Sequence, residues 1–315
     1  MKLQKQSEQT LGVLSVAIAY FFWGILPIYW KFVQSVPATQ VLAHRIFWSF
    51  IFVLALLLVS GQIKAFFADF VDIVHHPKKF FLVFAASAIV SVNWLTYIWA
   101  VNSNHVIETS LGYYINPLIS VMLGVIVLRE KLSLWQMVSF CLALIGVLIV
   151  TLHFGSVPWI ALTLAISFGL YGLLKKTISY GALTGLGLET LFITPFALIF
   201  LTYVHNQGGG AFGGLKISAL LMGAGVVTAI PLILFASGAK RLPLSVVGFI
   251  QYIAPTIALL LGVFLYHEPF TKVHLVSFVF IWAALIIFSL SKTNYFIQLE
   301  SLLVKRIMTG KRETY

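Results

Sequence analysis

The chain of 315 residues is 60% apolar and only 9% charged, and its mean hydropathy is +1.01. A soluble domain needs about 25% charged residues to cover its surface, so this composition excludes a soluble enzyme and predicts a surface that faces lipid. The net charge of +11 comes from basic residues scattered between apolar runs, which is typical of the loops of a membrane protein and not of a nucleic-acid-binding face.

Ten apolar runs, each about as long as a helix needs to cross a bilayer, follow one another along the chain. The first run, Leu11 to Tyr29, follows Lys2 and Lys5 and is too long for the core of a signal peptide, so we expect it to remain as a span. The sequence therefore predicts an all-α membrane protein with ten transmembrane helices. They are expected at residues 11–30, 38–60, 80–101, 106–128, 133–152, 157–174, 182–204, 217–238, 244–266 and 273–291.

The basic residues between the spans indicate how the chain is inserted. With the N-terminus in the cytoplasm, sixteen of the twenty Lys and Arg residues fall on the cytoplasmic side, three fall on the far side, and Arg45 lies within a span. Because cytoplasmic loops carry an excess of Lys and Arg, this asymmetry predicts that both termini are cytoplasmic. Residues 293–315 are then a basic cytoplasmic tail.

The longest predicted cytoplasmic connection is residues 61–79, which contain Asp69, Asp72, His75 and His76. Their spacing matches no recognised set of metal ligands, so we expect a solvated loop and no metal site. The sequence also has no phosphate-binding glycine motif and no nucleophile motif. We therefore expect no cofactor.

A stretch in the middle of the chain recurs near its end. Residues 108–140 align without gaps on residues 246–278, a shift of 138 positions that matches Tyr114 to Tyr252, Pro117 to Pro255 and Glu130 to Glu268. With five spans in each half, the two copies face opposite ways. We expect two inverted five-helix repeats, residues 1–153 and 154–292. This is the architecture of alternating-access carriers, in which the binding site lies between the repeats near the middle of the membrane.

Ionisable side chains within spans are costly and are candidates for function. Arg45 and Glu108 fall at similar depths, so we expect that they can pair, either as a structural ion pair or as part of a gate or solute site. Glu189 has no obvious cation near its depth. A poorly hydrated carboxylate could bind and release protons, so proton coupling through Glu189 is one hypothesis. The other is a glutamate that faces a wet cavity or bonds to a helix backbone.

Polar and aromatic residues crowd the same part of the predicted membrane. Pro117 and Pro255 each free a backbone carbonyl and kink a helix there, which suits a cavity wall. Aromatic faces with a few hydrogen-bonding groups suit a small organic solute better than a bare ion, although plain helix packing would use the same residues. The candidate solute-binding residues are Arg45, Asn93, Trp94, Glu108, Tyr113, Tyr114, Asn116, Glu189, Gln251 and Tyr252.

Four stretches resemble one known family. AHRIFWSF (43–50), NWLTYIWAVN (93–102), ETSLGYYINPL (108–118) and GFIQYIAPT (248–256) are similar to the RarD branch of the EamA family, within the drug/metabolite transporter superfamily. The resemblance implies a bacterial inner-membrane protein of ten helices in two inverted repeats that moves small metabolites or drugs, commonly outward. It also implies that seven positions carry the family's kinds of residue: Arg45, Asn93, Glu108, Tyr113, Asn116, Glu189 and Gln251.

Three classes of function stay open on these residues. A secondary carrier or facilitator, with a small-molecule substrate and the lipid bilayer as its partners and with possible proton coupling, agrees best with the inverted repeat. A membrane sensor or assembly partner without transport would more often carry a soluble domain. An intramembrane enzyme would need catalytic groups at one depth, and only Arg45 with Glu108 comes near. Oligomeric state stays open.

Overall fold

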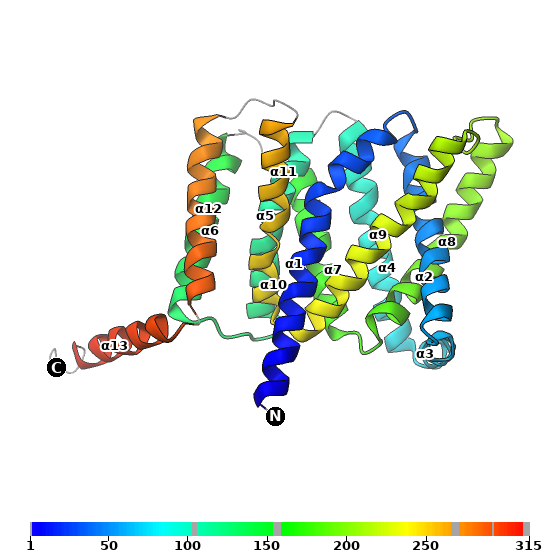
Figure 1. Cartoon of the computed structure of the whole chain (residues 1–315). Coiled ribbons are helices and arrows are strands. Elements are labelled where there is room, and N and C mark those ends of the chain that lie inside the picture. Colours follow the sequence, from blue (N-terminus) through cyan, green and yellow to red (C-terminus); the bar gives the residue numbers. More distant parts are fainter. Residues whose placement is uncertain (1, 103–105, 154–158, 266–270, 292, 311–315) are drawn as a thin grey trace.

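A computed structural model describes residues 2–102, 106–153, 159–265, 271–291 and 293–310. Over these residues the chain forms thirteen helices and no strand, and most of them stand side by side as a bundle (Figure 1). The helices are α1 (Lys2–Phe32), α2 (Ala38–Val59), α3 (Ile63–His75), α4 (Pro77–Asn102), α5 (Val106–Ile126), α6 (Leu134–His153), α7 (Trp159–Thr177), α8 (Ala182–Asn206), α9 (Leu215–Arg241), α10 (Leu244–Ile250), α11 (Ile253–Phe264), α12 (Lys272–Leu290) and α13 (Asn294–Gly310).

The ten predicted spans are confirmed over the described residues. Nine helical stretches are long and apolar enough to cross a membrane, one of which, Leu244–Leu265, joins α10 and α11, and the shorter apolar helix Leu111–Ile126 within α5 is the tenth. The break between α10 and α11 has a local cause. Pro255 has no N–H to offer the carbonyl of Gln251, and that carbonyl accepts from the Ala254 N–H at 3.2 Å instead.

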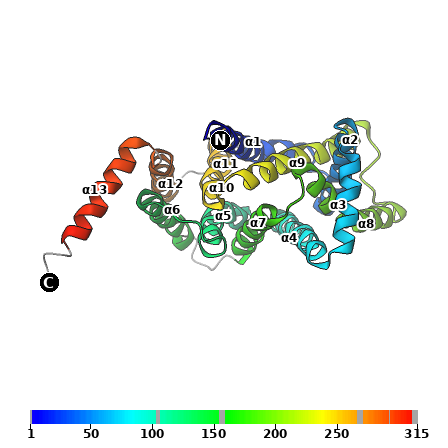
Figure 2. The same ribbon diagram turned by 90° about the horizontal axis from the view of Figure 1, so that it is seen from below.

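The helices of the two halves are interleaved. In the first half α1 packs along α9 and α11, and in the second half the corresponding helix α7 packs along α4 and α5. Three further contacts join equivalent helices of the two halves, α2 with α8, α5 with α10 and α6 with α12, and α2 also packs along α9. Figure 2 shows α1, α9 and α11 in one row and α5, α7 and α4 in a second row facing it. The interior of the bundle is therefore built by both halves together.

The expectation of a solvated loop at residues 61–79 is wrong, because thirteen of these residues form α3. Phe66 and Ile73 are buried, and the Phe66 ring lies against α8 at Gly187, where a Cβ would come within 3.0 Å of it. The side chain of Asp72 accepts from the hydroxyl of Tyr180 at 2.6 Å and from Lys79 Nζ at 2.7 Å. The apolar residues between Phe66 and Ile73 were the sequence signal for this helix.

Helix α13 extends outward from the bundle beside the start of α6, on the same side as the beginning of α1 (Figure 1). We call this side of the bundle the terminal side. Trp135 Nε1 donates to the Phe296 carbonyl at 3.0 Å, and Glu300 Oε1 accepts from the Leu134 N–H at 2.9 Å. These two hydrogen bonds attach α13 to the start of α6.

Candidate functional site

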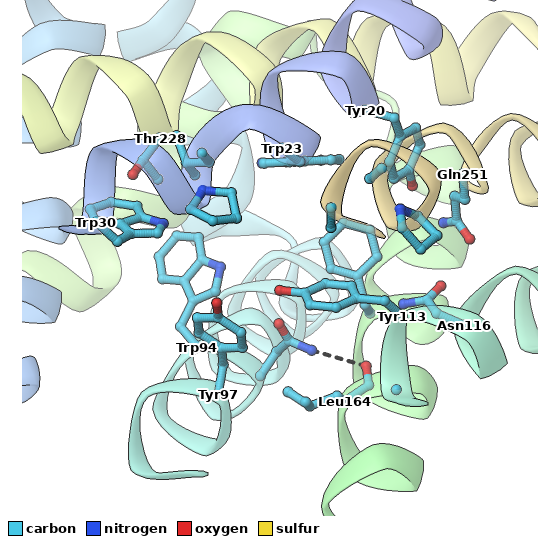
Figure 3. Close-up of a pocket in the computed structure, with 18 of the residues that line it drawn as sticks. Tyr20, Trp23, Trp30, Trp94, Tyr97, Tyr113, Asn116, Leu164, Thr228 and Gln251 are labelled. Carbon is cyan, nitrogen blue, oxygen red and sulfur yellow. Dashed lines mark hydrogen bonds between the residues drawn. The ribbon is translucent and has the colours of Figure 1, made fainter. Parts of the chain in front are cut away.

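A cavity lies between the two rows of helices. It has an empty volume of about 1070 Å³, including the open space at its mouth. It is lined by α1, α2, α4 and α5 of the first half and by α7, α9, α11 and the break between α10 and α11 of the second. The aromatic side chains in its wall are Tyr20, Trp23, Trp30, Trp94, Tyr97, Tyr113 and Phe168, all but the last of which are labelled in Figure 3. A cavity of this kind binds organic molecules through their apolar faces and orients them through a few polar groups.

The cavity occupies the middle of the bundle and the half away from the terminal side. On α1 its lining runs from Tyr20 to Trp30, in the second half of that helix, and on α2 it includes Arg45, seven residues from the start. Below it, toward the terminal side, the rings of Tyr171 and Phe235 stack with centroids 6.1 Å apart and are fully buried. The cavity is therefore closed toward the terminal side.

Arg45 forms one end of the cavity. A close crossing of α2 and α9 places it there. A Cβ on Gly225 would lie 2.3 Å from the backbone of Trp48, and Ser49 Oγ donates to the Gly225 carbonyl at 3.0 Å. One turn earlier on α2 and one turn later on α9, Arg45 Nε donates to Thr228 Oγ1 at 3.1 Å. The guanidinium carbon lies 4.6 Å from the ring centre of Trp30 and 5.1 Å from that of Trp94, within range of a cation–π interaction.

Neutral polar groups form the other end. In Figure 3, Tyr20, Gln251 and Asn116 lie together, across the cavity from Trp30 and Thr228. Ser120 Oγ is 3.3 Å from Asn116 Oδ1 and 3.2 Å from Gln251 Oε1, so it is the neighbour of both amide oxygens. The hydroxyl of Tyr20 is buried toward Gln251 and makes no hydrogen bond of normal geometry with the described residues. This end can therefore still make hydrogen bonds to a solute.

Asn93 lines the cavity between these ends, but its amide nitrogen is already used. Asn93 Nδ2 donates to the Leu164 carbonyl at 3.0 Å (Figure 3) and to Ser167 Oγ at 2.9 Å, which ties α4 to α7. Its part in the site is mainly to position these helices.

The structure brings together six of the ten predicted site residues. Arg45, Asn93, Trp94, Tyr113, Asn116 and Gln251 all line the cavity, and solute binding by them stays a prediction. The side chain of Glu108 lies outside the described residues, so its expected pairing with Arg45 also stays a prediction.

Tyr114 and Tyr252 do not line the cavity. They turn toward α6 and α12, where Tyr252 packs in an apolar cluster with Ile281 and the Tyr114 ring meets that of Phe278 at 5.3 Å. Each follows its cavity-lining neighbour in the chain, Tyr113 or Gln251, and the next residue of a helix points about 100° away. Their observed role is packing.

Glu189 also lies outside the cavity, and the expectation that it has no cation nearby is wrong. Its Oε1 accepts from Lys175 Nζ at 2.8 Å and its Oε2 accepts from the Tyr171 hydroxyl at 3.0 Å. Both charged side chains are only 2% exposed. Lys175 lies in the last turn of α7, next to a predicted connection, and its side chain reaches Glu189 on α8.

Charged side chains from both halves hold the turn between α9 and α10 on the terminal side. Lys176 donates to the carbonyl of Leu242 at the end of α9. Glu130 accepts from the N–H groups of Leu244 and Ser245 at 2.6 and 2.9 Å and so caps the start of α10. Each charge therefore meets the helix end whose dipole it stabilises. A few residues further on, Ser133 and Gln136 exchange hydrogen bonds and so form a capping box at the start of α6.

Sequence reasoning missed the contribution of α1. The cavity is lined by Tyr20, Trp23 and Trp30. The sequence prediction includes them only as members of an apolar span. With Pro27 they repeat at intervals of three or four residues, which places them on one face of a helix. This aromatic face was the available signal. Thr228 and Phe168 carried no comparable signal, because their place depends on helix crossings.

The EamA-like transporter family model matches residues 10–152 and again 156–290. The chain belongs to the EamA-like transporter family. This EamA protein is 47% identical over 292 residues to the uncharacterized transporter YojE of Bacillus subtilis, with 92% of this chain and 97% of YojE covered. It is 46% identical to RarD of Salmonella typhimurium and 42% identical to RarD of Escherichia coli, each over 90% of this chain and 95% of the relative.

A crystal structure of a protein 17% identical in sequence has the same fold. The TM-score is 0.67, and the superposition covers 91% of this chain and 99% of the other. This EamA protein is accordingly a multi-pass membrane protein with a transporter fold, whose cavity lies where its two halves meet.

Proposed function

We propose that this EamA protein carries a small organic solute across the bacterial inner membrane, as a secondary carrier or facilitator that works by alternating access. The observation that supports this most strongly is the aromatic cavity, because helices of both halves build it and it is closed on one side. Carriers with inverted repeats bind their solutes at this place and move one half against the other around the bound solute.

Alternating access requires that the terminal side can open while the opposite side closes. The contacts that must separate are Lys176 and Glu130 with the turn between α9 and α10, together with the stacked rings of Tyr171 and Phe235. Glu130 contacts the turn from the first half, whereas Lys176 and Tyr171 lie on α7 of the second half, so opening must separate α9 and the turn from α7 as well as from the first half. This supports a gate on the terminal side.

The proposed orientation places both termini in the cytoplasm. The support is the distribution of basic residues along the sequence, sixteen on the predicted cytoplasmic side against three on the opposite side. The cavity then opens to the periplasm, and we propose export as the working direction, by analogy with the resemblance of the sequence to RarD proteins.

We propose that an ion or solute gradient supplies the energy. Proton coupling through an isolated Glu189 has little support, because Lys175 already balances its charge at 2.8 Å. Proton coupling through another group remains part of the proposal, and a pH gradient across the vesicle membrane tests it.

The test is counterflow into proteoliposomes that contain the purified protein, with a panel of organic acids, amino acids and antibiotics, with and without a pH gradient. Ala258 lines the cavity, and Ala258→Trp should block it and abolish flux at normal folded yield. Ile199→Trp, on the lipid-facing side of α8, is the matched control and should keep wild-type flux. Equal flux through both variants would contradict transport through this cavity. Solute binding without flux in the wild type would favour a sensor.

A further inference from the structure

Arg45 is a buried cation without a partner anion among the described residues. It is 8% exposed, and no Asp or Glu of the described part of the chain forms an ion pair with it. Placing a guanidinium within a membrane carries a substantial cost in free energy. A charge of this kind is stable when a group that arrives from outside balances it, and the cavity is the place from which such a group can arrive.

The geometry of the guanidinium indicates what that group is. In the described part of the chain, only Arg45 Nε donates to a protein acceptor, Thr228 Oγ1, so the two Nη groups keep their four N–H donors. These donors form a planar fork that matches the two oxygens of a carboxylate. Trp30 and Trp94 lie against the guanidinium, which restricts its orientation.

The rest of the cavity fits the body of the same molecule. Trp23, Tyr113 and Phe168 provide apolar faces between the two ends. At the far end Ser120 lies next to the oxygens of Asn116 and Gln251, so their amide nitrogens, together with the buried Tyr20 hydroxyl, remain for a polar group of the solute. Among the described lining residues no carboxylate is present that could balance an ammonium group.

We propose that the solute of this cavity is an organic monoanion with a flat apolar body, whose carboxylate binds Arg45 and whose far end carries a hydroxyl or carbonyl facing Tyr20 and Gln251. Arg45 then determines specificity for anions over neutral analogues. The movement of this anion rests on the proposed function, but its binding does not, so the two can fail separately.

The experiment measures binding to the purified protein in detergent, by quenching of the cavity tryptophans and by thermal shift. The probes form a matched series: 3-phenylpropionate, its amide 3-phenylpropionamide, the cation 2-phenylethylammonium and phenylalanine. The carboxylate should bind at least tenfold more tightly than each of the other three. Binding of the amide, the cation or phenylalanine as tightly as the carboxylate would overturn the proposal.

Variants then test whether Arg45 is the cause. Arg45→Gln should remove the preference for carboxylate over amide while leaving amide binding within about twofold, which a general loss of structure would not do. Arg241→Gln, an exposed arginine on the terminal side, is the control and should bind like the wild type. If Arg45→Gln folds poorly, Thr228→Val should weaken carboxylate binding several-fold and spare the amide. An equal loss of both probes in these variants would overturn the assignment.

The far end is tested with 3-(4-hydroxyphenyl)propionate. The wild type should bind this probe more tightly than 3-phenylpropionate, and Gln251→Leu and Tyr20→Phe should each reduce that difference. An unchanged difference in both variants would overturn the assignment of this end. Flux of a neutral solute, with no preference for carboxylates in binding, would support the proposed transport and contradict this inference. Tight binding of the carboxylate without any flux would support this inference and contradict the proposed transport.

Discussion

Arg45 and Lys175 are both almost fully buried, but their surroundings differ. Lys175 meets Glu189 at 2.8 Å, in a network that Tyr171 completes, below the cavity on its terminal side. Arg45 meets two indole rings and one hydroxyl, at the wall of the cavity. The surroundings of each cation match its region, because Lys175 lies in closely packed helices and Arg45 lies at an open cavity.

Buried charges have two different roles in this bundle. The pair of Lys175 and Glu189 is complete without a solute and joins α7 to α8, so its role is to keep the closed half together. Arg45 has donors left over, so it can respond to a solute. A buried charge alone therefore does not identify a binding site. The distinguishing feature is that the charged group keeps N–H donors that no protein acceptor uses.

The largest expected effect on stability comes from breaking the ion pair of Lys175 and Glu189. Glu189→Leu leaves Lys175 buried without its partner, and we expect a loss of about 3–5 kcal/mol in the free energy of unfolding. The double variant Lys175→Met with Glu189→Leu should recover most of this loss, because it removes both charges together. Unfolding of the purified variants in detergent measures both values.

If Glu189→Leu and the double variant lose the same free energy of unfolding, the ion pair is not what stabilises this region. The proposed difference between Lys175 and Arg45 would then be contradicted. A Lys175→Met single variant is the second half of this cycle and should also be strongly destabilised, because it leaves the Glu189 carboxylate buried alone.

A smaller effect is expected at the cavity. Arg45→Met removes the cation together with its desolvation cost, one hydrogen bond and two cation–π contacts, and these changes act in opposite directions. We expect the free energy of unfolding to change by less than about 2 kcal/mol. A loss as large as that of Glu189→Leu in the same assay would show that Arg45 is a structural cation like Lys175.

The smallest effect is expected at an exposed pair on the terminal side. Hydrogen bonds from Lys79 and then from Tyr180 hold the pKa of Asp72 below its usual value. A carboxylate with a lowered pKa stabilises the fold above the unfolded-state pKa of about 3.9 and loses this contribution as the pH falls through the lower folded-state value. The hydrogen exchange of the α3 amides, corrected for the intrinsic exchange rate at each pH, should therefore rise on acidification below about pH 4.

Tyr180→Phe removes one of the two donors and should move this rise to higher pH. Asp72→Asn should show fast exchange at every pH and no acid step from this site. An acid step of normal size in Asp72→Asn would contradict the assignment to Asp72.

The ten spans could be predicted because each is set by local composition, the length and apolarity of one segment. The inverted architecture followed from one alignment, that of Tyr114, Pro117 and Glu130 on their counterparts. The site was harder. Arg45, Asn116 and Gln251 were found because polar groups in apolar spans are conspicuous, but the choice between Tyr113 and Tyr114 depends on helix rotation, which the sequence left open.

The partner of Glu189 was missed for a similar reason. Lys175 is close to the end of a span, where a cation usually reaches the interface, and only its contact with Glu189 of α8 buries it. Lys175 lies two residues before the end of α7 and Glu189 lies seven residues after the start of α8. Depth counted along the chain therefore does not pair them, because the long lysine side chain spans the difference.

The most direct test of the central claim, that the aromatic cavity with Arg45 holds an organic anion between the two halves, is an experimental structure with 3-phenylpropionate bound. We predict density for the phenyl ring between the aromatic walls, with the carboxylate oxygens within hydrogen-bond distance of the Arg45 Nη atoms. Density for the ligand outside this cavity, or in it with the carboxylate turned away from Arg45, would contradict the account.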